Sequence, residues 1–301
     1  MFQFAVTAAL EELPLTQPVV LRGTIEEVCK TAKKYGYDAI ELHIREPKRY
    51  HASVIRKTAS DYGLAIAAVA TGMEYTVGGL SLIDDDIVKR EAALNRVYEH
   101  ADFCAALSPG SASGNKSGPS SGNYPGASLE NFPGTRLIVG IMRGNVPKNG
   151  NVNVYSSIFS QNLGKICDYA EKIKVPVVVE SIIRYINNYF CGVGETMDFI
   201  TAQNRKNLSL HIDTHHMVVE ERNIRESLLY CKNKPLGYVH YSDNNRLYPG
   251  GGAIDFKELT RTLVEIGYGG TISVECLPWP SQEECAQRAI INMKNYLKEV
   301  S

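Results

Sequence analysis

Short, continuously apolar runs alternate with longer amphipathic segments along the whole chain. The apolar runs are rich in Val, Ile, Leu and Ala, which is typical of parallel strands buried on both faces. We expect strands at Phe2–Ala9, Asp38–Ile44, Leu64–Thr71, Leu137–Met142, Val175–Glu180, Leu208–Asp213, Gly237–Ser242 and Thr271–Glu275. The amphipathic segments carry apolar residues at helical spacing. We expect helices at Thr24–Tyr35, Ala52–Tyr62, Lys89–Ala106, Ile158–Lys172, Thr196–Asn204, Ile224–Lys232, Asp255–Ile266 and Gln282–Val300.

Eight strand–helix pairs in 301 residues predict an α/β protein with the (β/α)8 or TIM barrel fold, as one domain over residues 1–301. A protein with an open, doubly wound sheet would also show strands and helices in alternation along the chain. However, no GxGxxG motif opens a helix directly after a strand, as a dinucleotide-binding sheet would often show. Asp255 and Ser281 stand where helix caps are expected, and glycines close several helices, as in YGYD and DYGL.

One segment departs from this rhythm. Residues 108–134, Ser108 to Gly134, are rich in Gly, Ser, Asn and Pro and predict a flexible insertion. The insertion joins a helix to the following strand, so in a barrel it emerges on the N-terminal face, away from the catalytic mouth. We therefore expect an exposed loop, with an oligomer contact as the alternative.

Composition narrows the class of partner. With 44% apolar and 22% charged residues and a net charge of −1, the chain is globular and has no global attraction to nucleic acid or anionic membranes. No secretory signal or membrane span is evident, so we expect a cytoplasmic protein that binds a small molecule. The seven cysteines are scattered without a CxxC pair, which indicates buried small side chains and neither a disulfide framework nor a zinc knuckle.

The run LSLHIDTHHMVVEE shows an apolar strand that ends in several metal-competent side chains. Glu180 ends the run VPVVV, Asp213 ends LSLHI, His240 lies in GYVHYS and Glu275 follows TISV. These four residues are each about one strand–helix unit apart, so four consecutive strands present one such side chain toward the same mouth. Three oxygen donors and one imidazole nitrogen suit Mn²⁺, Mg²⁺ or Co²⁺, whereas Zn²⁺ more often recruits more nitrogen or sulfur.

Each residue also has an ordinary structural interpretation. Asp213 could cap a helix, but the next predicted helix starts some ten residues later, which favours a ligand. Glu180 follows a wholly apolar run, where an isolated buried carboxylate would be costly. His211 lies inside a strand and is expected to be structural. His51 and His100 lie on helices and are expected to be solvated.

The stretches VVVESIIRY, HIDTHHMVVEE, VHYSDNNRLYPGGGAIDF and SVEC, with DAIEL at the second strand, resemble the sugar phosphate isomerase/epimerase family of xylose isomerase-like TIM barrels. The likeness is greatest to the ketose 3-epimerases of the D-tagatose and D-psicose type. It implies one divalent ion, with Mn²⁺ expected first, held by Glu180, Asp213, His240 and Glu275. It also implies substrate contacts from His216 and Arg246, and a homo-oligomer, a dimer or a tetramer.

The resemblance implies an enediolate mechanism in which Glu180 and Glu275 act as the acid and base on opposite faces of the sugar. Inverting a carbon beside a ketone needs two such groups, and a cation offsets the charge that develops. An aldose–ketose isomerisation would use the same intermediate. The expected substrate is thus a ketose, a sugar phosphate or a related sugar acid.

The chain also departs from the epimerase pattern. Ser181 follows the glutamate where proline is usual, and Ile186 stands where a second glutamate is usual. Several cations lie just past strand ends and could bind an anionic substrate, or pair with the acids of the site. These are Arg143, Arg184 and Arg246, with His43 after the second strand.

Other functions stay open on the sequence. An inosose-type dehydratase or a hydroxypyruvate-type isomerase could use the same metal site, and a sugar-binding barrel without activity could keep the ligands. An apurinic endonuclease of the same barrel type would need additional histidines at the early strands, and these are absent here.

Overall fold

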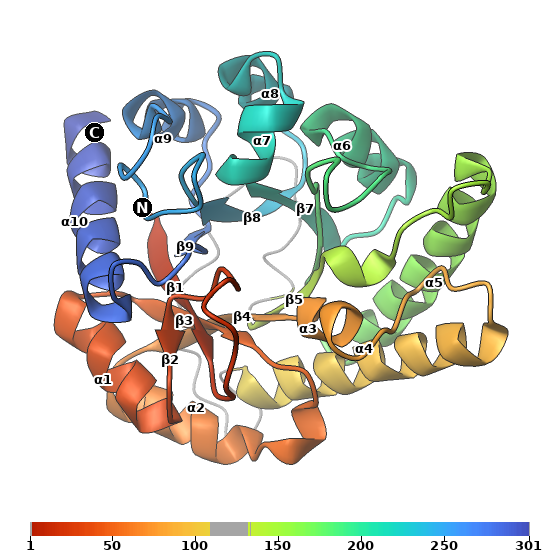
Figure 1. Cartoon of the computed structure of the whole chain (residues 1–301), viewed down its shortest axis with the longest axis horizontal. Coiled ribbons are helices and arrows are strands. Elements are labelled where there is room, and N and C mark those ends of the chain that lie inside the picture. The colour runs from red at the N-terminus through yellow and green to blue at the C-terminus, as the bar shows by residue number, and fades with distance from the viewer. Residues whose placement is uncertain (1, 109–131, 133, 301) are drawn as a thin grey trace.

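The computed structural model describes residues 2–108, 132 and 134–300, and it forms a closed ring of parallel strands surrounded by helices (Figure 1). The strands of the ring are β1 (Gln3–Ala9), β3 (Ala39–His43), β4 (Ala65–Ala70), β5 (Arg136–Val139), β6 (Val177–Glu180), β7 (Leu208–Asp213), β8 (Leu236–Tyr241) and β9 (Thr271–Val274). Each pairs with the next in sequence order, and β1 pairs with β9, with Phe4 opposite Ile272. The (β/α)8 prediction is therefore confirmed. A short strand, β2 (Leu21–Arg22), adds to β1 outside the ring.

The predicted helices all form on the outside of this ring (Figure 1). They are α1 (Ile25–Tyr35), α2 (Ala52–Asp61), α4 (Ile87–Leu107), α5 (Val152–Lys172), α6 (Val193–Ala202), α8 (Ile224–Tyr230), α9 (Phe256–Glu265) and α10 (Gln282–Val300). Local sequence sets their ends. Asp255 caps α9 by accepting from the Glu258 backbone N–H, and Gly36 closes α1 at φ 87°, a conformation that glycine adopts without a steric penalty.

Short helical segments after some of the strands were not predicted. They are α3 (Gly72–Thr76), α7 (Thr214–Glu220) and the 3₁₀ turns η1 (Pro47–Arg49) and η3 (Ile141–Arg143). The expectation of a strand through Met142 is wrong, because β5 ends at Val139 and the chain turns at Gly140 into η3. Segments of three to seven residues are too short to show a helical period in the sequence.

The interior of the ring is filled first by small apolar side chains and then by polar ones. Ala39, Val178 and Tyr238 are buried in one cluster. Each stands two residues before Glu41, Glu180 or His240, so it faces the interior one layer deeper than that residue. The apolar layer closes the ring below the mouth, and the polar side chains above it form the candidate site.

Two expectations about single side chains have opposite outcomes. His51 is exposed, as expected, at the start of α2. His100 is fully buried, so its expected solvation is wrong: its Nδ1 lies 2.8 Å from the Arg96 carbonyl and its Nε2 lies 2.8 Å from the Ile44 carbonyl. It stands three residues after the buried Val97, on the face of α4 that packs against the ring.

The remaining expectations concern the cysteines, the membrane and the insertion. All seven cysteines are free thiols, and six are buried, as expected of small apolar side chains. No described helix has both the length and the apolar composition needed to cross a bilayer. The expected insertion at 108–134 lies mostly outside the described residues.

Candidate metal and sugar site

The four predicted ligands meet at the carboxyl ends of their strands. Glu180 ends β6, Asp213 ends β7, His240 lies in β8, and Glu275 directly follows β9. One ligand atom from each lies within 4.8 Å of the others. Asp213 and His240 are at most 1% exposed, and the two glutamates are 9% exposed. The group is thus nearly buried but reachable from the mouth.

Arg246 and His216, the predicted substrate residues, contact this group. The Arg246 Nη1 lies 2.5 Å from Asp213 Oδ2 and 3.1 Å from Glu275 Oε2. Its Nη2 lies 3.3 Å from the His216 Nε2, which is itself 3.6 Å from Glu180 Oε1. The structure therefore brings both residues into the cluster.

The loop after β8 is built to hold Arg246 in place. The buried Asp243 accepts four backbone N–H groups, from Asn244, Gly250, Gly252 and Ile254. Arg246 has φ 60°, a left-handed conformation that is uncommon for a residue with a side chain. Its backbone N–H donates to Asp243 and its carbonyl accepts from Leu277. Such strain is typical of functional positions and persists because the surrounding contacts enforce it.

The electrostatics of the cluster fit a divalent cation. Burial and the nearby Glu275 raise the pKa of Glu180 to about 8. Burial also raises the pKa of Asp213, although Arg246 opposes this effect. Burial disfavours the charged form of Glu275 as well, but His240 and Arg246 hold its pKa well below the ordinary range. Crowded, buried acids of this kind are stabilised by a cation that binds between them. The donor set of three carboxylates and one imidazole suits Mn²⁺, Mg²⁺ or Co²⁺.

Asp213 belongs to the cluster and also caps a helix, an interpretation that was set aside on the sequence. The helix α7 begins directly after it, and Asp213 Oδ1 accepts the His215 backbone N–H at 2.8 Å as the helix cap. The expectation that no helix follows immediately was therefore wrong. Because capping uses Oδ1, Oδ2 stays on the cluster side, where it meets Arg246. Capping thus orients the carboxylate for its second role.

The Glu180 carboxylate occupies space left by Gly140, the residue that follows the neighbouring strand β5. A Cβ atom added to Gly140 would lie 2.5 Å from Glu180 Oε2, which is closer than any real contact of this kind. The turn that ends β5 therefore leaves room for the carboxylate.

The other predicted substrate residues are dispersed. Arg143 is fully buried and donates to the backbone carbonyls of Glu180, Tyr189 and Phe190, so it supports the loop after β6 from below. Arg184 is 62% exposed and forms a bidentate pair with Glu220 of α7. Neither guanidinium contacts the side-chain ligand atoms of the cluster. His43 does reach it, with its Nε2 3.8 Å from Glu275 Oε1.

Two residues that the sequence analysis did not assign to the site lie directly beneath it. Glu41 on β3 is fully buried and contacts both His43 and His240. Burial alone would raise the pKa of Glu41, but His240 and His43 lower it well below the ordinary range. His211 is also fully buried, and its ring centroid lies 4.1 Å from that of His240. Among the described residues, Glu180, His211 and His240 form a second group with ligand atoms within 4.8 Å.

The period-two rule would have found both residues. Glu41 stands two positions before His43, and His211 two positions before Asp213, so each pair shares one face of its strand. A glutamate inside the otherwise apolar run AIEL needs a partner for the same reason as Glu180.

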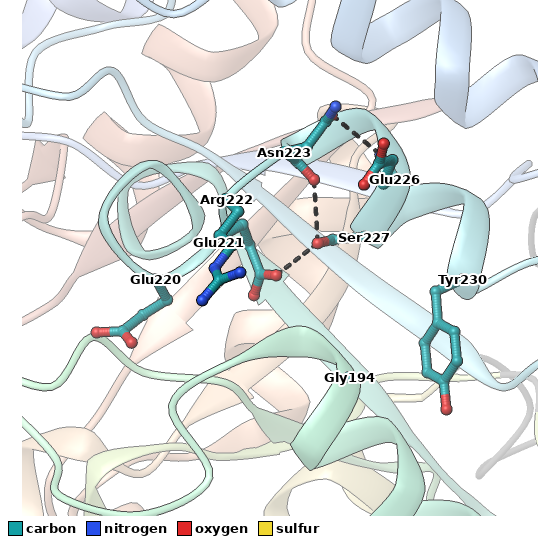
Figure 2. A pocket seen from close by; sticks show the side chains of 8 residues that line it. All are labelled: Gly194, Glu220, Glu221, Arg222, Asn223, Glu226, Ser227 and Tyr230. Carbon is teal, nitrogen blue, oxygen red and sulfur yellow. Dashed lines mark hydrogen bonds between the residues drawn. The ribbon is translucent and has the colours of Figure 1, made fainter.

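A separate cavity lies on the outside of the ring, beside α6, α7 and α8 (Figure 2). Its lining comprises Gly194, Glu220, Glu221, Arg222, Asn223, Glu226, Ser227 and Tyr230. Glu221 accepts the Val193 backbone N–H at the start of α6 and also contacts the Ser227 hydroxyl. No residue of the metal cluster lines this cavity. The two glutamates that follow HHMVV have local partners instead: Glu220 pairs with Arg184, and Glu221 links the start of α6 to Ser227 of α8.

Comparison with known proteins places the chain in a family. Residues 29–295 match the model of the xylose isomerase-like TIM barrel family, and the chain belongs to this family. This match confirms the resemblance found in the sequence.

Characterised relatives include an L-ribulose 3-epimerase of Methylomonas sp. (strain DH-1), 26% identical over 249 residues, or 81% of this chain and 75% of that protein. A ketose 3-epimerase of Arthrobacter globiformis is 25% identical over 244 residues, or 81% of this chain and 74% of that protein.

Solved structures share the fold. The chain superimposes on an L-ribulose 3-epimerase with a TM-score of 0.79 at 18% identity, covering 100% of this chain and 96% of that one. A D-psicose 3-epimerase from Clostridium cellulolyticum H10, solved with D-tagatose, gives a TM-score of 0.76 at 17% identity, covering 98% and 99%.

Proposed function

We propose that this protein is a divalent-metal-dependent epimerase of a ketose that inverts the carbon beside the ketone through an enediolate. The observation that carries the proposal is the placement of Glu180 and Glu275. They follow strands β6 and β9, which are three positions apart around the eight-stranded ring, and both reach the same ion-binding group. Two carboxyls that approach from different parts of the rim can act on opposite faces of one carbon. The relatives named as ketose and L-ribulose 3-epimerases support the same activity.

The two carboxyls have different electrostatic surroundings, which shift their pKa values in opposite directions. Glu275, whose pKa is well below the ordinary range, is ionised at neutral pH and serves as the base. Glu180, whose pKa is raised by burial and by the nearby Glu275, holds a proton more readily and would act as the acid that delivers a proton to the opposite face. Environments that separate the pKa values of two carboxyls are how enzymes assign these roles. For the reverse reaction the two residues exchange roles.

The surrounding residues position the sugar. His216 and Arg246 lie against the carboxylates and would donate hydrogen bonds to sugar oxygens, while His43 lies at the β3 side of the mouth. Glu180, Asp213, His240 and Glu275 would hold a divalent ion, with Mn²⁺ expected first, and its positive charge would stabilise the negative charge that develops on the sugar oxygens. The near burial of the carboxylates limits water at the reacting carbon.

An uncharged ketose fits this mouth better than a sugar phosphate or sugar acid. Arg143 is fully buried and hydrogen-bonded to backbone carbonyls, Arg184 is paired with Glu220, and Arg246 is paired with Asp213 and Glu275. Of the four cationic residues expected to bind an anion, all three arginines already have acceptors within the protein. A phosphate or carboxylate would have to displace one of these pairs.

The test is product analysis of metal-loaded protein incubated with a panel of ketoses and their phosphates. We expect a C3 epimer from an uncharged ketose, and loss of that product with either Glu180→Gln or Glu275→Gln. The Glu226→Gln variant, an exposed glutamate of the outer cavity, is the matched control and should keep full activity. Turnover of phosphates alone would contradict the substrate class. An aldose as the product would replace epimerisation with isomerisation.

A further inference from the structure

The carboxylate of Glu41 lies directly under the metal group and is saturated by side-chain donors. Its Oε2 accepts from His240 Nε2 at 2.9 Å and from the Tyr238 hydroxyl at 3.0 Å. Its Oε1 accepts from His43 Nε2 at 3.0 Å and lies 3.2 Å from His240 Nε2. Glu41, Tyr238 and His240 are at most 1% exposed. Water therefore does not compete for these contacts.

These contacts decide which nitrogen of His240 faces the ion-binding group. A neutral imidazole carries one N–H, and the hydrogen bond made by one nitrogen determines what the other can do. In the neutral form of His240, which cation binding requires, Nε2–H is directed at Glu41 and Nδ1 carries the lone pair. That Nδ1 lies 3.5 Å from Glu275 Oε2, on the cluster side of the ring. Nδ1 is therefore the nitrogen available to a cation.

The Tyr238 hydroxyl keeps the Glu41 carboxylate from rotating away. Tyr238 and His240 stand two positions apart on β8, so both face the interior, and they hold the same oxygen, Oε2. Glu41 is likewise two positions from His43 on β3. One carboxylate thus links a predicted metal ligand to a predicted substrate residue on the opposite side of the mouth.

We infer that Glu41 is a positioning residue that fixes the Nε2–H form and the ring orientation of His240, so that Nδ1 is presented to the divalent ion. This inference rests on the proposed metal-dependent function and deepens it. Carboxylates that orient metal-binding histidines typically contribute 10–100-fold, as an order of magnitude, to metal affinity. Glu41 acts through His240 and does not itself bind the ion or the sugar.

Two measurements test the inference without using turnover. In protein loaded with diamagnetic Mg²⁺ or Zn²⁺ and labelled with ¹⁵N-histidine, long-range ¹H–¹⁵N NMR reports which nitrogen of His240 carries the proton. We expect Nε2–H in the wild type, and in Glu41→Gln a shifted or exchange-broadened Nε2–H signal, because the carboxylate acceptor is lost. Calorimetric titration with Mn²⁺ should show binding weakened about 10–100-fold in Glu41→Gln. The Glu41→Asp variant, which keeps the charge, should recover part of the loss.

Glu74→Gln is the matched control. Glu74 is also a buried glutamate that follows the next strand, but it pairs with Arg96 and not with the cluster. Its substitution should leave Mn²⁺ affinity unchanged. If Glu41→Gln lowers affinity no more than Glu74→Gln, or if the Glu41→Gln protein keeps the wild-type His240 Nε2–H signal, the inference is overturned. If Glu41→Gln does not fold, the same comparison is made with Glu41→Asp.

The outcomes also separate this inference from the proposed function. Weakened metal binding in Glu41→Gln supports the positioning role even when no sugar is epimerised by the wild type. A wild-type protein that binds no divalent ion overturns both proposals. Epimerase activity with an unchanged metal affinity in Glu41→Gln overturns only the positioning role.

Discussion

The guanidinium of Arg246 lies against the carboxylate of Asp213, with 2.5 Å between Nη1 and Oδ2. The same nitrogen lies 3.1 Å from Glu275 Oε2, so Arg246 bridges two of the four predicted metal ligands. Its positive charge occupies the position where an ion's charge is needed. We infer that Arg246 balances the charge of the acids before the ion binds and donates to sugar oxygens when the sugar is bound.

Replacing Arg246 should therefore affect the metal and the sugar in opposite directions. In Arg246→Gln, Mn²⁺ should bind up to about tenfold more tightly, because a competing cation worth roughly 1.4 kcal/mol is removed. The KM for the ketose should rise, because a donor to its oxygens is lost. Calorimetry and steady-state kinetics measure the two effects. Arg184→Gln, far from the cluster, should change neither, and a weaker Mn²⁺ affinity in Arg246→Gln would contradict the bridging role.

A side chain at Gly140 should displace the Glu180 carboxylate. In Gly140→Ala the new Cβ would lie 2.5 Å from Glu180 Oε2, so the Glu180 carboxylate must move. This carboxylate is both a predicted metal ligand and the proposed acid. We expect at least about tenfold lower kcat, in line with the cost of small misplacements at an active site. Gly194→Ala is the control, because the nearest atom to its added Cβ is 4.0 Å away. Equal activity of the two variants would show that Glu180 can relocate freely.

Metal removal should lower stability, because the buried acids then repel one another. A ligand that binds only the folded protein stabilises it by about 2.7 kcal/mol at one hundred times its Kd. Thermal unfolding with Mn²⁺ or with EDTA should show this difference. In Asp213→Asn the difference in melting temperature between Mn²⁺ and EDTA should shrink strongly, because the variant loses the negative charge of one predicted ligand. The same melting temperature with and without Mn²⁺ in the wild type would argue against the site.

The pair of Arg184 and Glu220 predicts a small pH dependence. Hydrogen bonds from Arg184 lower the pKa of Glu220. The unfolded pKa of a glutamate is about 4.3, and a carboxyl whose folded pKa is lower stabilises the fold at pH values above the unfolded pKa. This stabilisation disappears as the pH falls through the folded pKa. Urea unfolding at pH 7 should therefore show Glu220→Gln as less stable than the wild type, with the gap narrowing below pH 4. A gap that widens in acid would contradict this assignment.

The fold and the meeting of the four predicted ligands at one end of the ring could be deduced from the sequence, because both follow from strand periodicity. Glu180, Asp213, His240 and Glu275 each end or nearly end an apolar run, and a closed ring brings those ends together. Glu41 and His211 obey the same rule but lie one layer deeper, where a polar residue within a strand is easily read as structural.

The directions in which the arginine side chains point could not be deduced from the sequence. Arg143 and Arg184 both follow strand ends, but whether such a side chain turns into the mouth, under a loop or onto a helix depends on the loop conformation. The short helix α7 was missed for a related reason: seven residues carry too little periodicity to reveal it. Its absence from the sequence interpretation hid the capping role of Asp213.

The most direct test of the central claim is NMR of deuterium uptake by the sugar in D₂O, with metal-loaded wild type, Glu180→Gln and Glu275→Gln. The two-carboxyl account predicts that the wild type introduces deuterium at C3 as the C3 epimer appears. In both variants, labelling and epimer formation should be slower than in the wild type. Epimerisation without solvent label at C3, or undiminished labelling by both variants, would contradict the account.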